Sequence, residues 1–298
     1  MQELLQNIIN GLALGSVYAL VALGYTMVYG VLQFINFAHA DIFMLGAYAG
    51  IYIAAWCGFI QSPALVFVIA MLGIMIFCTI VALLVERIAY RPLRTAPRLN
   101  VLITAIGVSL FLENLGQVVF GADPRVFPSI INTESLLTGN IVLNNIQLMV
   151  IGVSTLLMLV LHWVVHHTKL GIAMRAVSYD IEIAGLMGIP TDRVITFTFV
   201  IGSALAGAAS LLYGLSYPKV EPLMGVMIGI KAFVAAVFGG IGNIMGAAVG
   251  GVVLGLAESL VVFYVSSSFR DAIAFAILIL ILLLRPEGLF GRPRREKV

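Results

Sequence analysis

The sequence predicts an all-α polytopic membrane protein with about nine transmembrane helices. Of its 298 residues, 61% are hydrophobic and 10% are charged, and the mean hydropathy is +1.11. A water-soluble protein of this length could not bury so much apolar surface. Four runs contain no Asp, Glu, Lys or Arg, and each is longer than the roughly 20 residues that cross a bilayer. These runs are 4–40, 42–85, 135–168 and 194–218.

The two longest runs each hold two crossings, because each contains a break. The stretch "GVLQFINFAHAD" (30–41) brings polar side chains into the first run, and "CGFIQSP" (57–63) supplies a Gly and a Pro turn signal in the second. The expected spans are 7–30, 38–56, 64–85, 100–121, 145–166, 194–214, 225–239, 244–265 and 271–285.

Basic residues set the expected orientation. They gather in two loops and in the tail: Arg87, Arg91, Arg94 and Arg98; Lys169, Arg175 and Arg193; and Arg285, Arg292, Arg294, Arg295 and Lys297. The positive-inside rule places all three groups, and therefore the C-terminus, in the cytoplasm. An odd number of spans then places the N-terminus outside. The net charge of +2 reflects these loops, and no basic face indicates nucleic-acid binding.

The sequence lacks the motifs that several kinds of chemistry need. No G-x-x-x-x-G-K-[ST] loop is present, so any ATP is hydrolysed by another subunit. His162 and His166 lie one helical turn apart, but Trp163 stands where a zinc-binding helix needs its general-base Glu. The two cysteines show no metal-ligand spacing. With no nucleophile and base pair either, we expect no enzyme and no metal or other cofactor in this chain.

Polar and ionisable side chains inside apolar spans are costly and therefore indicate function. The candidates for a transport pathway are Asn36, His39, Asp41, Glu113, Lys231 and Glu258. Two structural alternatives stay open. Lys231 could pair with Glu113 or Glu258 to join helices, and His39 and Asp41 could lie hydrated near the cytoplasmic surface.

The glycine-rich run "GGIGNIMGAAVGGVVLG" (239–255) predicts a helix break followed by a closely packed helix. Gly239, Gly240 and Gly242 form the break, and the later glycines give a small-residue face that lets helices approach. The spacing does not match a dinucleotide-binding fingerprint. A similar break leads into "INFAHADIFMLGAYAG" in the first half, which predicts two parallel pseudo-repeats.

The stretch 171–189 is expected to form a short cytoplasmic helix that begins at Gly171 and ends near Gly188 and Pro190. Four apolar residues follow helical spacing on one face, and three polar residues follow it on another; these are Met174, Val177, Ile181 and Ala184, and Arg175, Tyr179 and Glu182. Periodicity alone is also consistent with a helix that rests on the lipid surface.

A resemblance favours docking to another subunit. "EIAGLMG" (182–188) resembles the E-x-A-x-x-x-G loop with which permeases of ABC importers dock to their ATPase. Longer stretches resemble the LivH-type permeases of bacterial branched-chain amino-acid importers over nearly the whole chain. They are "LGSVYALVALGYTMVYGVLQFINFAHAD", "ERIAYRPLR", "GIPTDRVITFTFVIG", "AAVFGGIGNIMGAAVGGVVLGLAESL" and "LLRPEGLFGRPRREKV". The chain departs from that family at Ala40 and Asp41, often Gly and Glu there, and at Asn243 and Met245, often Ser and Pro.

The resemblance implies a single permease domain, 1–298, in the bacterial inner membrane. Its partners would be a second, LivM-like permease, two ABC ATPase subunits that bind ATP and Mg, a periplasmic amino-acid-binding protein, and membrane lipid. Gly171, Arg175, Glu182, Ala184 and Gly188 would then couple the chain to the ATPase. An ion-coupled transporter or channel is the alternative from another class. Within the family, urea, amides or other amino acids are alternative substrates to Leu, Ile and Val.

Overall fold

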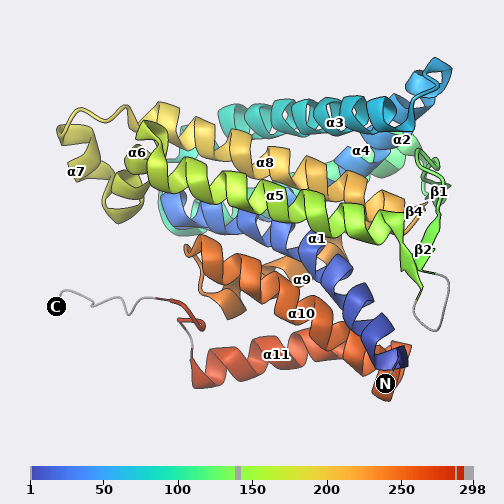
Figure 1. Cartoon of the computed structure of the whole chain (residues 1–298). Helices are drawn as coiled ribbons and strands as arrows, with labels where there is room; N and C mark the ends of the chain where they lie inside the picture. Colours follow the sequence, from blue (N-terminus) through green and yellow to red (C-terminus); the bar gives the residue numbers. More distant parts are fainter. Residues whose placement is uncertain (1, 95, 138–141, 286, 292–298) are drawn as a thin grey trace.

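The computed structural model describes residues 2–94, 96–137, 142–285 and 287–291, and in these the chain is a helical bundle (Figure 1). The α-helices of the described residues are α1 (Gln2–Leu32), α2 (Ala38–Trp56), α3 (Pro63–Val85), α4 (Arg98–Phe120), α5 (Asn145–His167), α6 (Lys169–Tyr179), α7 (Ile181–Leu186), α8 (Thr191–Ser216), α9 (Met224–Gly239), α10 (Ile244–Tyr264) and α11 (Arg270–Leu284). The all-α polytopic membrane class is thereby confirmed.

Nine of these helices correspond to the nine expected spans. Eight helical segments of the described chain are long and apolar enough to cross a membrane, and α9 is a shorter apolar helix. With 16 residues, α9 is about 24 Å long at 1.5 Å per residue. The start of α1 lies at the end of the bundle that carries the strands, and residues 287–291 lie at the other end, with α6 and α7 (Figure 1). This arrangement agrees with an odd number of crossings.

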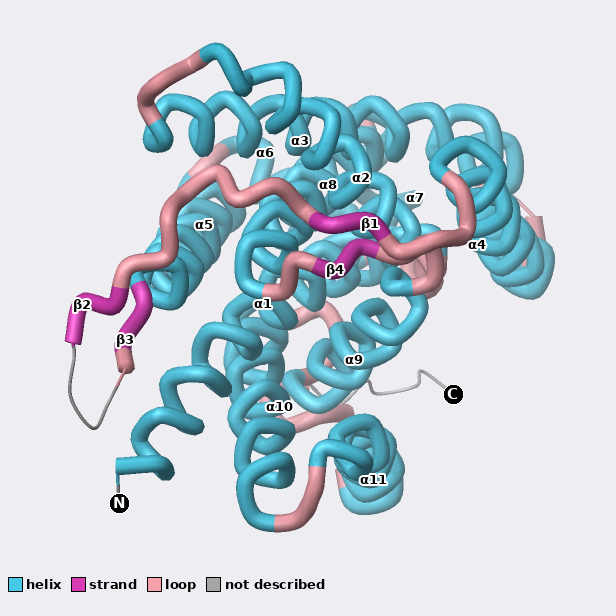
Figure 2. Tube along the Cα trace, turned by 90° about the vertical axis from the view of Figure 1, so that its right-hand side faces the viewer, coloured by secondary structure: helices cyan, strands magenta, loops and turns pink. Residues whose placement is uncertain are grey.

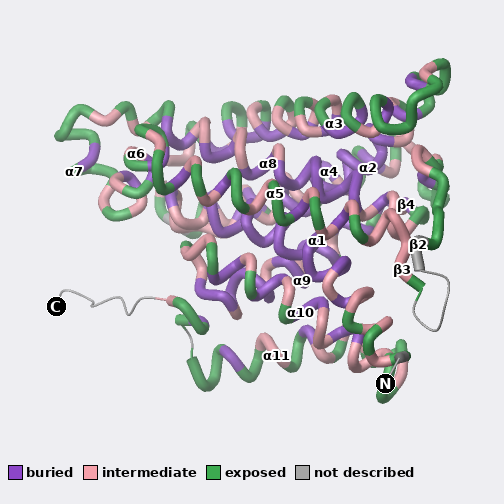
Figure 3. The backbone as a smooth tube through the Cα atoms, in the orientation of Figure 1, coloured by how far each residue is buried: buried purple, intermediate pink, exposed green. Residues whose placement is uncertain are grey.

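The helices divide into an inner and an outer set. Most of the buried residues belong to α1, α2, α8, α9 and α10 (Figure 3). In contrast, α3, α4, α5 and α11 expose many large apolar side chains, including Leu72, Ile103, Leu159 and Leu283. Exposed leucine and isoleucine along whole helices would be unfavourable in water and are favourable against lipid tails. The outer set therefore faces the bilayer or a partner subunit.

The three expected breaks are present. The first follows Leu32, where Gln33 adopts a left-handed backbone with φ of +56°. The second lies between a short 3₁₀ turn (Cys57–Phe59) and Pro63 at the first position of α3. The third follows Gly239, where Gly240 and Gly242 have φ of +100° and +91°. Glycine adopts these angles without steric cost, which explains why the chain turns there.

Two small antiparallel sheets lie at the end of the bundle opposite α6 and α7 (Figures 1 and 2). One pairs β1 (Arg125–Val126) with β4 (Lys219–Val220), and the other pairs β2 (Ser135–Leu137) with β3 (Leu143–Asn144). Next to β1, the buried Phe127 ring packs so closely on Gly214 that a Cβ there would lie 2.7 Å from the ring. This contact anchors the loop to α8.

Candidate functional site

The proposed coupling segment consists of two helices rather than the single helix expected over 171–189, so that expectation was wrong. Helix α6 begins at Lys169, two residues before Gly171, and ends at Tyr179. Asp180 then caps α7, because its Oδ1 accepts hydrogen bonds from the backbone N–H groups of Glu182 and Ile183 at 3.0 and 2.9 Å. A short acidic side chain that binds these N–H groups favours a new helix start over helix continuation. We use "docking element" below for 169–190.

The apolar face of the docking element is largely as expected. Met174, Val177 and Ala184 are buried, whereas Ile181 is 42% exposed because the break at Asp180 turns it outward. Arg175, Tyr179 and Glu182 are exposed. Gly188 ends the segment in the left-handed conformation, with φ of +83°.

Gly171 has a packing role at the junction of α5 and α6. A Cβ on Gly171 would lie 2.2 Å from the Val165 carbonyl oxygen, so only glycine allows α6 to fold back so closely. From this closely packed base, α6 and α7 project beyond the bundle (Figure 1). Such a projection is suited to insertion into a partner.

The polar residues proposed for the pathway fall into separate groups. Lys231 Nζ lies 3.0 Å from Glu258 Oε1, which confirms one of the two pairings considered, and Glu113 is not part of this group. Lys231 Nζ also lies 2.8 Å from Asp271 Oδ1, and the Tyr18 hydroxyl donates to Glu258 Oε2 at 3.1 Å. This group joins α1, α9, α10 and α11.

Sequence reasoning missed Asp271 and Tyr18. Asp271 had a signal, since it is an acidic residue at the edge of the last expected span. Tyr18 had none, because a tyrosine in an apolar helix is an ordinary core residue.

The remaining polar candidates lie on or beside α2. The Ser109 hydroxyl of α4 donates to Asp41 Oδ2 at 2.6 Å, and the Tyr90 hydroxyl donates to Asn36 Oδ1 at 2.6 Å. His39 is buried against α1, where a Cβ on Gly24 would lie 2.2 Å from its Nε2. His39 and Asp41 are each 1% exposed, so the alternative that they are hydrated at the surface does not hold. Glu113, on α4, is only partly buried.

The break at Gly239, Gly240 and Gly242 is covered by the C-terminal segment, 287–291. The backbone N–H groups of Leu289 and Phe290 donate to the carbonyls of Phe238 and Gly239 at 2.9 and 3.1 Å. Asn243 Oδ1 accepts from Gly246 N at 3.1 Å, which caps α10, and Asn243 Nδ2 donates to the Phe290 carbonyl at 3.0 Å. The expected basic residues Arg292, Arg294, Arg295 and Lys297 lie outside the described residues.

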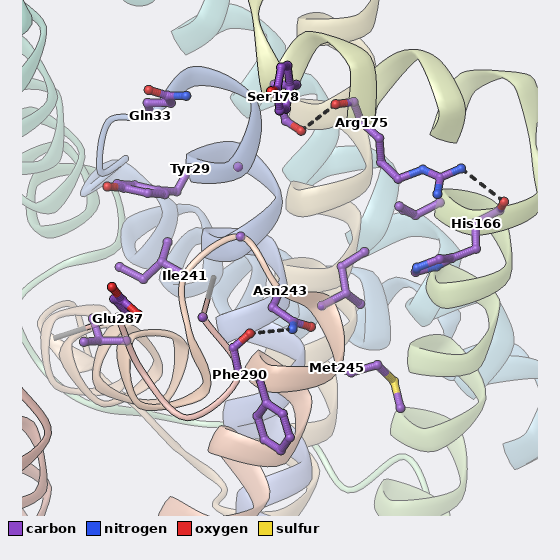
Figure 4. A pocket seen from close by; sticks show the side chains of 17 residues that line it. Tyr29, Gln33, His166, Arg175, Ser178, Ile241, Asn243, Met245, Glu287 and Phe290 are labelled. Carbon is purple, nitrogen blue, oxygen red and sulfur yellow. Dashed lines mark hydrogen bonds between the residues drawn. The ribbon is translucent and has the colours of Figure 1, made fainter. Parts of the chain in front are cut away.

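A cavity of about 810 Å³ opens between this segment and the docking element (Figure 4). Polar side chains on its walls come from α1, α6, the break and the C-terminal segment; they include Tyr29, Gln33, Arg175, Asn243 and Glu287. Its size suits a small solute. It extends from the break to the docking element.

Similarity to known proteins covers nearly the whole chain. The family model described as "Branched-chain amino acid transport system / permease component" matches residues 7–282. The high-affinity branched-chain amino acid transport system permease protein LivH of Salmonella typhimurium is 42% identical over 99% of this chain and 97% of its own. BraD of Pseudomonas aeruginosa, a permease protein of the same kind of system, is 41% identical over 99% and 98%. The probable LivH of Methanocaldococcus jannaschii is 29% identical over 91% and 88%. The chain therefore belongs to the family of branched-chain amino-acid transport system permease components.

Proposed function

We propose that this chain is a transmembrane permease subunit of an ATP-driven importer that moves leucine, isoleucine and valine across the bacterial inner membrane. The family membership and the two relatives at 41–42% identity support the substrate class. The polytopic bundle supports the role in the membrane.

The observation that carries the coupling to ATP is the docking element. It projects from the end of the bundle where residues 86–94 and the C-terminal segment also lie (Figure 1). Its exposed Glu182, its buried Ala184 and the left-handed Gly188 occupy the E-x-A-x-x-x-G positions. A rigid helix that inserts into a groove transmits motion between subunits, so closure of the ATPase dimer would move the docking element and the spans attached to it.

The partners follow from this role. A second, LivM-like permease would complete the channel, two ABC ATPase subunits would bind ATP and Mg, and a periplasmic binding protein would deliver the amino acid. The docking element and the C-terminus would then lie in the cytoplasm, and the strands would lie outside, where the binding protein arrives. Tight binding in the spans would slow release, so selectivity would reside mainly in the binding protein.

Co-purification and reconstitution test this proposal. Mass spectrometry of the gently solubilised native complex should recover a second permease and P-loop ATPases with this chain. The complex in proteoliposomes should take up labelled leucine only with ATP and the binding protein. Uptake by this chain alone, without ATP, that an ionophore abolishes would instead establish the ion-coupled transporter.

A further inference from the structure

Three stretches of the sequence make polar contacts to which the proposed function assigns no role. They are "INFAHAD" (35–41), "ERIAYRPLR" (86–94) and "GIPTDR" (188–193). They are far apart in the chain, yet the structure brings them together at the end of the bundle that carries the docking element. A hydrogen bond joins the second stretch to the first, and ion pairs join the second stretch to the third.

Arg94 is at the centre of this connection. One of its terminal nitrogens pairs with the Glu86 carboxylate and the other with Asp192 Oδ1. The side chain of Glu86 is only 4% exposed, and that of Arg94 is 16% exposed. The planar guanidinium can bridge two carboxylates at once, which a lysine ammonium on a flexible stem cannot do with the same geometry. Arg91 Nη2 adds a second contact to Asp192, at 3.0 Å from Oδ2.

Asp192 connects this cluster to the docking element. It lies in the first turn of α8, two residues after Pro190, where that element ends. A carboxylate in the first turn of a helix is also favoured by the helix dipole. Any displacement of the docking element therefore reaches Asp192 through a very short segment of chain.

Glu86 and Tyr90 connect the cluster to the membrane interior. They are the first and last residues of a π-helical turn that continues α3. Single π turns inside α-helices are rare and often mark functional positions. This turn places the buried Tyr90 hydroxyl 2.6 Å from Asn36 Oδ1, in the break between α1 and α2. Within the described residues Asn36 Nδ2 has no hydrogen-bond partner from the protein.

A cavity of about 440 Å³ separates the docking element from this cluster. Asp180 and Glu182 lie on one wall, and Glu86, Tyr90 and Arg94 lie on the other. A packed interface would resist small displacements, whereas this space allows the docking element to shift toward the cluster. Motion would then pass through the ion pairs and the Tyr90 hydrogen bond as well as through the apolar packing of Met174, Val177 and Ala184.

We propose that Arg94, held between Glu86 and Asp192, is a positioning residue that links the docking element to the α1–α2 break and so couples ATP hydrolysis to opening of the membrane path. This inference rests on the proposed importer function. It assigns to Arg94, Asp192 and Tyr90 a role in transmission, with no contact to the transported amino acid.

The test measures ATP hydrolysed per leucine taken up by the complete importer with its binding protein in proteoliposomes. Arg94→Gln and Asp192→Asn should each raise this ratio, by between about 2- and 30-fold, the range for single positions in a coupling network. The double variant should raise the ratio by less than the two single effects combined, because both single variants remove the shared Arg94–Asp192 pair. Tyr90→Phe, which removes only the hydroxyl, should also raise the ratio of ATP hydrolysed to leucine taken up.

Arg87→Gln is the matched control. It removes one positive charge from the π turn next to the cluster, at an exposed position that makes no ion pair within the described part of the chain, and should leave the ratio unchanged. Unchanged ratios in Arg94→Gln and Asp192→Asn, with or without a lower melting temperature, would show a purely structural role and overturn the inference. Additive effects in the double variant would also overturn it.

The variant Glu182→Lys separates this inference from the proposed function. If Glu182→Lys uncouples hydrolysis from uptake and the Arg94 and Asp192 variants do not, the role of Arg94 in transmission is contradicted and the proposed function stands. If the wild-type complex takes up no leucine with ATP, the proposed function itself has failed.

Discussion

Lys231 Nζ on α9 and Glu258 Oε1 on α10 are 3.0 Å apart in the interior of the bundle, where the Glu258 side chain is completely buried. An isolated charge in a membrane interior is very costly, but a pair with further hydrogen bonds is tolerated. Asp271 and Tyr18 supply those further contacts. The pair therefore joins helices that are separate in sequence, and each partner depends on the other.

Lys231→Met should destabilise the protein strongly, because it leaves Glu258 buried without its cation. The expected loss is about 3–5 kcal/mol in the free energy of unfolding, measured by denaturant unfolding in detergent micelles. The double variant Lys231→Met with Glu258→Met should recover most of that loss, since apolar side chains of similar volume replace both charges. A double variant no more stable than Lys231→Met would contradict this account.

The same double variant decides between a structural and a pathway role. If the pair only joins helices, leucine uptake should persist once stability has recovered. If uptake is lost from a stable double variant, the polar groups contact the solute as it crosses.

Glycines 251 and 255 set the distance between α1 and α10. A Cβ on Gly255 would lie 2.3 Å from Gly15 Cα, and one on Gly251 would lie 2.4 Å from Ala19 Cα. Gly255→Ala should therefore force the helices apart and lower the free energy of unfolding by about 1–3 kcal/mol. Gly152→Ala in α5, where a Cβ would meet no atom within 4 Å, should be neutral or stabilising by up to about 1 kcal/mol. Equal melting temperatures of the two variants would refute the close-packing explanation.

The spans and breaks could be predicted because their signals are local. Long uncharged runs, Pro63 and Gly240 fix helix ends within a few residues, whatever the tertiary structure. The helix over 171–189 was predicted as one unit because hydrophobic periodicity continues across Asp180. Only the cap hydrogen bonds to Glu182 and Ile183 reveal the break.

The site contacts required tertiary structure. Nothing in the sequence near Tyr90 indicates that its hydroxyl reaches Asn36, because the two residues are 54 positions apart. The same holds for Tyr18 and Glu258, which are 240 positions apart. The two pseudo-repeats and the single-domain assignment stay predictions, although each proposed repeat begins at a break with left-handed backbone, at Gln33 and at Gly240.

Asn243 should show two separable roles. Asn243→Asp keeps the oxygen that caps α10 but removes the donor to the Phe290 carbonyl. Amide hydrogen exchange of Leu289 and Phe290 should therefore become faster in Asn243→Asp, while Gly246 keeps its protection. In Asn243→Ala all three amides should exchange faster, and loss of the cap should cost about 1 kcal/mol. Unchanged exchange at Leu289 and Phe290 in both variants would show that the side chain does not hold the C-terminal segment.

Glu182→Lys should uncouple ATP hydrolysis from uptake and leave assembly of the two membrane subunits intact. Glu182 is exposed in the first turn of α7, where an acidic side chain is favoured by the helix dipole and is free to meet a basic groove on a partner. Reversal of its charge should weaken docking without disturbing the bundle.

The measurements are leucine uptake and ATP hydrolysis in proteoliposomes, with co-purification of the second permease as the assembly control. Glu134→Lys, an exposed reversal in the loop at the opposite end, should keep the normal ratio of hydrolysis to uptake. Normal uptake in Glu182→Lys would remove the docking hypothesis and leave the docking element as a helix pair on the lipid surface.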